Sequence, residues 1–298
     1  MSDEFCRSKE GSYRYVSRFS EEYPQRLQQI KDPPAGIYVK GSLPREDVPS
    51  VAIVGSRICS QYGRLAAEEF GRVLAQNGIQ IISGLARGID VIGQKSACEA
   101  GGRSFGILGC GVEVIYPKQN AAVYRQVESC GGLISELEPN AVPIGKHFAS
   151  RNRIIAALSD LVLVIEAKEK SGTQITVQRA LEQGKDIYAL PGRIHDICSA
   201  GCNSLIEQGA GIAKDPETIL AVFGIYPRKT DIHGDYETAG LERLEKLVYE
   251  KLDFYPRSIN EISSMSRLPV AELSNIIFHL QLKGFVKEEG RQYYVKVR

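Results

Sequence analysis

The chain has 298 residues, with 37 Lys and Arg against 36 Asp and Glu, so its formal net charge at pH 7 is +1. This balance excludes a uniformly basic nucleic-acid coat protein, and 43% hydrophobic with 24% charged residues is ordinary for a globular protein. At about 100 to 200 residues per domain, the length allows one large domain and one small one.

The sequence disfavours a membrane or secreted protein. Apolar runs such as 51–54 and 161–165 are far shorter than the roughly 20 residues that a membrane-spanning helix needs. The first residues lack the apolar core and the cleavage site of a secretion signal. Seven scattered cysteines indicate reduced thiols rather than a disulfide framework. We therefore expect a cytoplasmic protein without membrane insertion.

The first 45 residues predict an N-terminal arm. They are rich in tyrosine and charge, with a turn at Pro33-Pro34 and one strand-like segment at 36–41. So few residues cannot build a hydrophobic core of their own.

Residues 46–225 predict an α/β fold. Short runs rich in β-branched residues alternate with amphipathic stretches, a pattern typical of a parallel sheet with helices on both faces. We therefore predict an extended Rossmann-like, doubly wound, mainly parallel sheet. Its expected strands are 51–55, 79–84, 103–109, 132–137, 161–167 and 185–192.

The C-terminal part predicts a linker and a second domain. Gly, Pro, Asp and Thr concentrate in 226–240, a linker composition. Residues 241–298 then show three helical segments and two strands, a winged-helix-like order. The third helix offers only His279 and Lys283 as cations, which is poor equipment for holding duplex phosphates. Protein contact or structural support is favoured for this domain, with duplex recognition as the alternative.

Residues directly after the strands are the candidate ligand contacts, because ligands of parallel sheets bind outside the carboxyl ends of the strands. The first strand is followed by Gly55, Ser56 and Arg57, which combine close backbone approach, donors and a forked cation. No GxGxxG pattern follows, so dinucleotide binding is disfavoured. A second glycine turn precedes a later helix and suits phosphate oxygens. It consists of Ser171, Gly172 and Thr173.

Cations and one aromatic residue accompany these turns, as a groove for single-stranded nucleic acid requires. The candidates are Lys118, Lys146, Phe148, Arg151 and Arg153, together with the neutral Asn152 between the two arginines. Phe148 could instead be a hydrophobic staple. The two arginines lie at a helix start, where cations oppose the dipole, so each needs an anionic partner, inside the fold or on a phosphate.

No catalytic assembly is predicted. The serines lie in no GxSxG elbow, and the histidines form no HExxH pair. Asp90 and Glu166 could form a carboxylate pair, but sequence does not give their separation. Zinc on His195, Cys198 and Cys202 is disfavoured because no second pair completes a tetrahedron. We expect neither a metal nor a cofactor.

The order of these motifs resembles the DNA-processing protein A family (DprA, also called Smf). The matching segments are VAIVGSR, SGLARGID, ILGCGVEVIYPKQN, LISE, HFASRNRIIAALSD, VIEAKEKSGTQIT, ALEQGKDIYALPG and GCNSLIEQGA. The resemblance implies a homodimer that binds single-stranded DNA, protects incoming DNA and loads RecA recombinase in natural transformation, with no enzymatic activity. It assigns DNA contacts to Arg57, Lys118 and Phe148, and dimer contacts to a region that includes Leu205 and Ile206. A full N-terminal SAM-like domain would be truncated or absent.

Three positions depart from the family pattern. Gly145 stands where a pocket lysine is usual, with Lys146 next to it as the expected substitute. Gln94 stands where histidine is common, and Ala149 stands where proline is usual.

Two alternatives of another class use the same fold. A phosphoribohydrolase-like enzyme would need a Glu two residues after Thr173, where this chain has Ile175. A nucleotide-binding sensor would keep the glycine turns and signal through the C-terminal domain.

Overall fold

The computed structural model describes residues 13–226, 241–253 and 255–296, and the chain divides into two compact units at Pro227 and Arg228. Unit 1 contains a nine-stranded sheet of order β1-β2-β6-β5-β4-β3-β7-β8-β9. Its parallel strands are β3 (Ser50–Gly55), β4 (Gln80–Ser83), β5 (Ser104–Ile107), β6 (Gly132–Ser135), β7 (Leu161–Glu166), β8 (Asp186–Ala189) and β9 (Gly211–Ile212). All six predicted parallel strands are present, so the predicted fold class is confirmed.

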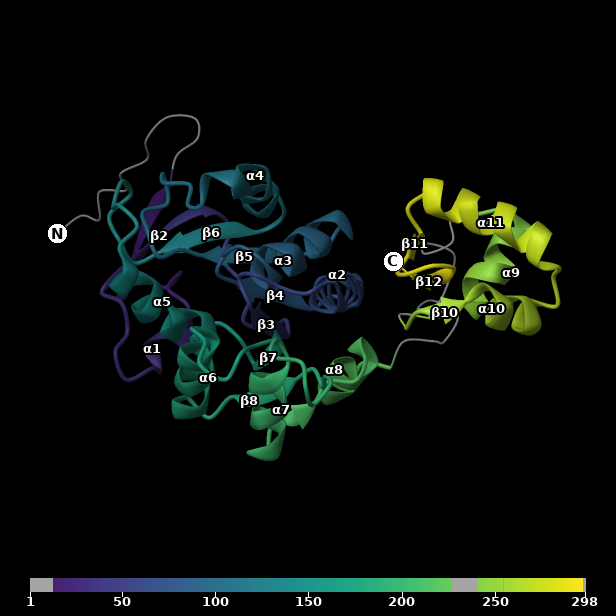
Figure 1. Cartoon of the computed structure of the whole chain (residues 1–298). Coiled ribbons are helices and arrows are strands. Elements are labelled where there is room, and N and C mark those ends of the chain that lie inside the picture. Colours follow the sequence, from purple (N-terminus) through teal and green to yellow (C-terminus); the bar gives the residue numbers. More distant parts are fainter. Residues whose placement is uncertain (1–12, 227–240, 254, 297–298) are drawn as a thin grey trace. The chain divides into compact units, whose positions relative to one another are not determined.

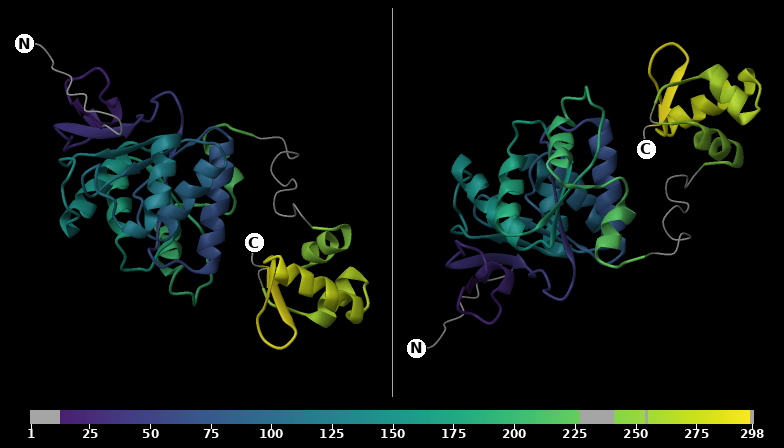
Figure 2. Two further views of the ribbon diagram at one scale, coloured as in Figure 1. Left: turned by 90° about the horizontal axis from the view of Figure 1, so that it is seen from above. Right: turned by 90° about the horizontal axis from the view of Figure 1, so that it is seen from below.

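Helices cover both faces of this sheet (Figures 1 and 2). One face carries α2 (Gln61–Gln76), α3 (Ile89–Glu99) and α4 (Ala121–Cys130), and α8 (Pro216–Val222) packs against α2. The other face carries α1 (Gln25–Gln28), α5 (Gly145–Ala157), α6 (Thr173–Glu182) and α7 (Ala200–Glu207). Both faces of the central strands are therefore buried, which explains their continuous apolar sequences.

Local sequence sets the ends of α2. The Ser60 hydroxyl accepts a hydrogen bond from the Gly63 amide at 3.1 Å and caps the first turn. The helix stops at Asn77, and Gly78 follows with φ of +82°, a conformation that glycine adopts without strain. The Asn77-Gly78 pair therefore ends this helix.

The predicted N-terminal arm is instead part of the main sheet. Strand β1 (Arg14–Ser17) pairs antiparallel with β2 (Gly36–Gly41), which pairs antiparallel with β6. Tyr23 and Leu27 are buried in the core that α5 also lines. Residues 13–45 therefore belong to unit 1, because they use its core rather than one of their own.

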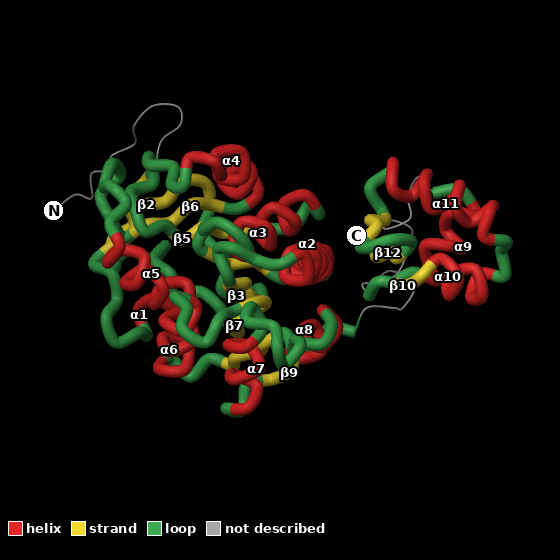
Figure 3. Tube along the Cα trace, viewed as in Figure 1, coloured by secondary structure: helices red, strands yellow, loops and turns green. Residues whose placement is uncertain are grey.

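Unit 2 is a winged helix, as predicted. Three helices, α9 (Arg243–Lys251), α10 (Ile259–Ser266) and α11 (Val270–Leu282), enclose a small apolar core. The strands β10 (Arg257–Ser258), β11 (Val286–Glu288) and β12 (Tyr293–Lys296) form a sheet of order β10-β12-β11 (Figure 3). Apart from Tyr226, the predicted linker lies outside the described residues.

The surface of α11 does not suit a duplex-reading helix. Nζ of Lys283 lies 2.6 Å from Glu245 on α9, and His279 lies 3.9 Å from the same carboxylate. Its exposed side chains include Phe278 and Leu282, which are 56% and 71% accessible. The two predicted cations thus face a carboxylate within unit 2, which favours support or protein contact over phosphate binding.

The cysteines differ from the prediction at one pair. Cys98 on α3 and Cys130 on α4 form a disulfide with Cα atoms 6.0 Å apart. Four other cysteines are free, namely Cys59, Cys110, Cys198 and Cys202, and Cys6 lies outside the described residues. The expectation of reduced thiols is therefore wrong for the α3–α4 pair. In the described part of the chain, no helix has the length and hydrophobicity needed to cross a bilayer.

Candidate nucleic-acid interface

The turn after β3 presents Arg57 at the carboxyl edge, the end of the sheet at which the parallel strands finish. The Ser56 amide donates to the Glu166 carbonyl at 2.7 Å, and the Ser56 carbonyl accepts from Ile89 at 3.2 Å. At Gly88, which has φ of +78°, any Cβ would clash with the carbonyl oxygen of Ser56. The turn is thus fixed on both sides, while the Arg57 side chain is exposed.

Glu166 occupies the N-terminus of α2. Its carboxylate accepts from the Ser60 amide at 2.9 Å and from the Ser60 hydroxyl at 2.6 Å, and Glu166 is 1% exposed. In dinucleotide-binding Rossmann folds, a helix N-terminus at this place receives the pyrophosphate. Here the protein's own carboxylate fills that position, which agrees with the absence of a GxGxxG pattern.

Asp90 serves a separate buried network with Arg151. The Asp90 carboxylate accepts from the Gly84 amide at 3.2 Å. From α5, Nη1 of Arg151 donates to the Gly84 carbonyl at 2.9 Å and to the Ile107 carbonyl. Burial raises the pKa of Asp90, and the positive charge of Arg151 opposes that rise. Asp90 and Glu166 therefore have different partners and form no catalytic pair.

This network corrects the prediction for Arg151. The residue is 5% exposed, and its guanidinium binds the ends of β4 and β5, so it cannot reach a phosphate directly. Burial lowers the pKa of Arg151, and the like charge of Arg57 lowers it further. The exposed arginine therefore stands near the buried one.

An aromatic pair lies at the same edge. The Phe148 ring packs on Gly109, where a Cβ would lie 2.5 Å from the ring. Tyr116 packs against Phe148 with ring centroids 5.5 Å apart and ring planes tilted by 39°, and Tyr116 is 48% exposed. Sequence reasoning identified Phe148 and missed Tyr116, although Tyr116 begins the YPK segment that contains Lys118.

Two lysines flank this pair. Lys118 is exposed at the start of a short 3-10 helix (Lys118–Asn120), which Asn120 ties to the Leu85 carbonyl at 2.9 Å. Lys146 is exposed in the first turn of α5. Within the described residues, neither lysine nor Arg57 forms an ion pair or a side-chain hydrogen bond. We call Arg57, Tyr116, Lys118, Lys146 and Phe148 the basic rim.

Other predicted contacts are placed differently. Arg153 binds both oxygens of Glu136 at 2.6 and 2.8 Å, so its anionic partner lies inside the fold. Asn152 and Thr173 are buried, which removes them from a surface contact. Gly55, Ser56, Ser171 and Gly172 remain at least partly accessible at the carboxyl edge, which β3 and β7 reach side by side.

The two predicted dimer residues differ in exposure. Leu205 is 5% exposed and belongs to the core of unit 1, so its side chain cannot contact a partner. Ile206 packs partly against that core and is half-buried. Ile212 on the edge strand β9 is 51% exposed and was not predicted.

The structure shows the surroundings of two of the positions that depart from the family pattern. Gln94 is fully buried, accepts from the Leu85 amide at 3.0 Å and donates to the Phe105 carbonyl at 3.0 Å. It therefore supports the turn after β4 and does not face a ligand. At Gly145, a Cβ would meet no atom within 4 Å, so a longer side chain fits there.

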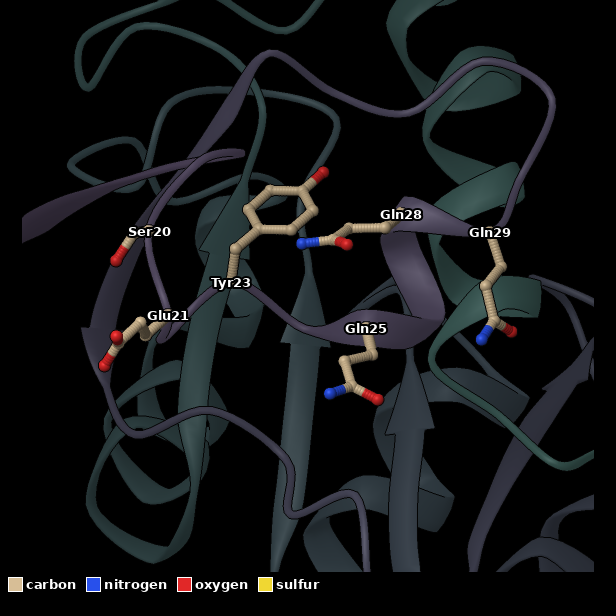
Figure 4. Close-up of a pocket in the computed structure, with 6 residues that line it drawn as sticks. All are labelled: Ser20, Glu21, Tyr23, Gln25, Gln28 and Gln29. Atoms are coloured by element: carbon tan, nitrogen blue, oxygen red, sulfur yellow. The ribbon is translucent and has the colours of Figure 1, made fainter.

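A polar pocket lies elsewhere, at the segment around α1 (Figure 4). Its lining contains Ser20, Glu21, Tyr23, Gln25, Gln28 and Gln29. These residues include no cation, so the pocket has no charge suited to a polyanion. Within the part of the chain that the structure describes, no cluster of His, Cys, Asp and Glu could hold a metal ion.

Comparison with known proteins identifies the family. The model of DNA recombination-mediator protein A matches residues 14–224, and that of the DprA winged helix domain matches 236–290. The chain belongs to the DprA family. DNA processing protein DprA of Streptococcus pneumoniae is 41% identical over 67% of this chain and 71% of that protein. Protein Smf of Escherichia coli is 34% identical over 96% of this chain and 78% of that protein.

Solved DprA structures share the fold of unit 1. The S. pneumoniae structure has a TM-score of 0.66 at 40% identity and covers 70% of this chain and 73% of its own. The DprA structure from Helicobacter pylori, which describes a single-stranded DNA binding mode, has a TM-score of 0.64 at 32% identity. It covers 74% of this chain and 97% of its own.

The Arg151 network yields a stability prediction. Arg151→Met should lower the free energy of unfolding by about 3 to 5 kcal/mol, because it leaves Asp90 buried without its cation and two carbonyls unpaired. Urea unfolding followed by circular dichroism measures this loss. The exposed Arg57→Ala should change stability by less than about 0.5 kcal/mol. Equal losses in the two variants would contradict the structural role of Arg151.

Proposed function

We propose that this protein binds single-stranded DNA on the basic rim, protects incoming DNA and loads RecA recombinase in natural transformation. The proposal depends on one observation, the difference between the carboxylates and the cations at the carboxyl edge. Glu166 and Asp90 are engaged inside the fold, whereas Arg57, Lys118 and Lys146 are exposed around a ring pair. Cations follow a DNA backbone and aromatic rings stack on bases, so this arrangement suits a single strand.

The related proteins support the same ligand and pathway. The H. pylori DprA structure concerns single-stranded DNA binding, and the family model describes a recombination mediator. RecA loading follows from that description as part of the proposal. A cytoplasmic location, without membrane insertion, is the compartment in which such a protein would meet RecA and incoming DNA.

The proposed role is binding without catalysis. Ile175, where a phosphoribohydrolase would carry its Glu, is 38% exposed on α6. Of the nearby carboxylates, Glu166 caps α2, and Asp90 is buried, accepts from the Gly84 amide and lies close to the charge of Arg151, so neither is available to activate water. A nucleotide sensor is distinguished by competition, because micromolar displacement of an oligonucleotide by a mononucleotide would favour the sensor.

Salt dependence tests the three cations. If each neutralises one phosphate, affinity for an oligonucleotide should fall with salt at a log-log slope of about −2, from roughly 0.7 per phosphate. Arg57→Ala should reduce that slope by about 0.7 and weaken binding.

Phe148→Ala should cost about 1 to 3 kcal/mol of binding free energy with an unchanged slope, because it removes a stacking ring and no charge. Fluorescence anisotropy at several salt concentrations measures both quantities, and unaltered binding by Arg57→Ala would refute the basic rim.

A gain of affinity tests the departure at Gly145. Gly145→Lys should tighten binding and steepen the salt slope by about 0.7, because the new side chain has open space beside Lys146 and Phe148. Gln76→Lys is the matched control, since it adds the same charge at the far end of α2, away from the carboxyl edge. A similar gain in both variants would show a general charge effect rather than a contact at the rim.

We also propose a homodimer formed through α7 and β9. Ile206 and the exposed Ile212 offer apolar contacts there, and the edge strand β9 has free pairing positions on its outer side. Ile212→Asp should yield monomers in light scattering with an unchanged circular dichroism spectrum, because Ile212 is exposed in the single chain. Ile206→Asp should do the same with some loss of stability, since Ile206 also packs on the core. Dimers that persist in both variants would place the interface elsewhere.

A further inference from the structure

The loop between β8 and α7, residues 190–199, is held in a defined shape. The Asp196 carboxylate accepts from the Cys198 amide at 3.0 Å and from the Ser199 hydroxyl at 3.3 Å. At its start, Gly192 exchanges two hydrogen bonds of 3.1 Å with the side chain of Asn203 on α7. The carboxylate of this loop is therefore turned onto its own backbone.

The same loop holds two large apolar side chains in solvent. Ile194 is 84% exposed and Ile197 is 71% exposed. A third isoleucine, Ile58, is 79% exposed directly after Arg57. Burial of apolar side chains is favourable. Because the loop is fixed in this shape, it keeps these isoleucines in contact with water, and a bound partner that covers them would gain free energy.

The loop lies beside the Arg57 turn. Strand β7 pairs with β3 on one side and β8 on the other, so the segments after all three leave the sheet at the same edge. The hydroxyl of Tyr62, in the first turn of α2, donates to the Pro191 carbonyl at 2.8 Å. The turn that carries Arg57 and Ile58 and the loop that carries Ile194 and Ile197 are therefore neighbours at the carboxyl edge.

Several cations lie on these turns, together with carboxylates. Burial raises the pKa of the Cys198 thiol, the negative charges of Glu166 and Asp196 raise it further, and the positive charge of Lys168 opposes the rise, so Lys168 lies near the loop. Arg57, Arg193 and Lys170 are also exposed on these turns, against Glu169 and the inward-turned Asp196. Exposed isoleucines with cations beside them are complementary to single-stranded DNA, because the strand presents both negatively charged phosphates and the apolar faces of its bases.

We infer that a bound single strand continues from the basic rim past Arg57 onto this loop, where bases rest against Ile194 and Ile197. The inference rests on the proposed function and extends it to a second section of the DNA site. The occupant is the next stretch of the same strand, because the surface is continuous with the rim and cationic.

Oligonucleotide length separates the two sections. An oligonucleotide of about 5 nucleotides fills the rim alone, whereas one of about 20 nucleotides also reaches the loop. The double variant Ile194→Ser, Ile197→Ser should bind the long strand about five to ten times more weakly and the short strand as wild type does. Its salt slope should not change, since no cation is removed. Leu181→Ser, at a 61% exposed leucine in the last turn of α6, is the matched control and should affect neither length.

Cys198 gives an independent readout within the loop. It is a free, partly accessible thiol, so its alkylation by N-ethylmaleimide in the full chain can be followed by mass spectrometry of its peptide after digestion, which separates it from the other partly accessible thiol, Cys59. The long strand should slow its labelling several-fold, and the short strand should leave the rate unchanged.

The outcomes distinguish the inference from the proposed function. If Arg57→Ala weakens binding of the short strand but the isoleucine variant binds the long strand normally and Cys198 stays unprotected, the inference alone is wrong. If the wild-type protein binds neither strand, the proposed function fails first. A change in light-scattering mass for the isoleucine variant, with DNA binding per subunit unchanged, would assign the loop to protein contact and overturn the inference.

Discussion

The buried cation at the centre of the carboxyl edge organises the rest of the interface. Arg151 reaches from α5 to the carbonyls that end β4 and β5, and Asp90 supplies its counter-charge. Phe148 lies three residues earlier on α5 and packs on Gly109, two residues after Ile107. A helix surface brings positions i and i+3 together, so the contact that fixes Arg151 also fixes the Phe148 ring of the basic rim. Removing this cation would therefore disturb the aromatic pair without touching any exposed charge.

The placement of charge explains why this Rossmann-like sheet suits a chain of nucleotides rather than a dinucleotide. Glu166 covers the amides of α2 that would otherwise attract a pyrophosphate. What remains at the edge are long cationic side chains on separate turns, spread from Lys118 to Arg57. Such a row of side chains can contact successive phosphates along a strand, and each contact adds a modest, salt-dependent increment to the binding affinity.

Sequence predicted the elements whose signals are local and missed those that depend on distant partners. The parallel strands and the winged helix carried clear periodicity, and both were found at the expected positions. Strand β1 has four residues, and it forms because β2 pairs with it. The burial of Arg151 and Leu205 could not be predicted either, because it depends on tertiary contacts. An arginine at a helix start and a leucine near an edge give no local sign of burial. Tyr116 could have been found, because an aromatic residue two places before a rim lysine fits the same logic that selected Phe148.

Some glycines of this interface are required by packing, and one is not. At Gly109 and Gly88, any side chain would collide with Phe148 or with the Ser56 carbonyl, so these glycines are required for the shape of the edge. At Gly145 no atom lies within 4 Å, so its glycine is not imposed by packing. The absence of the lysine usual in the family at this position is therefore a difference in the surface charge of the proposed DNA site and not in the fold that presents it. If Lys146 does not replace that lysine, binding would depend more on stacking and on apolar contact with bases, which is the role that we propose for the loop after β8.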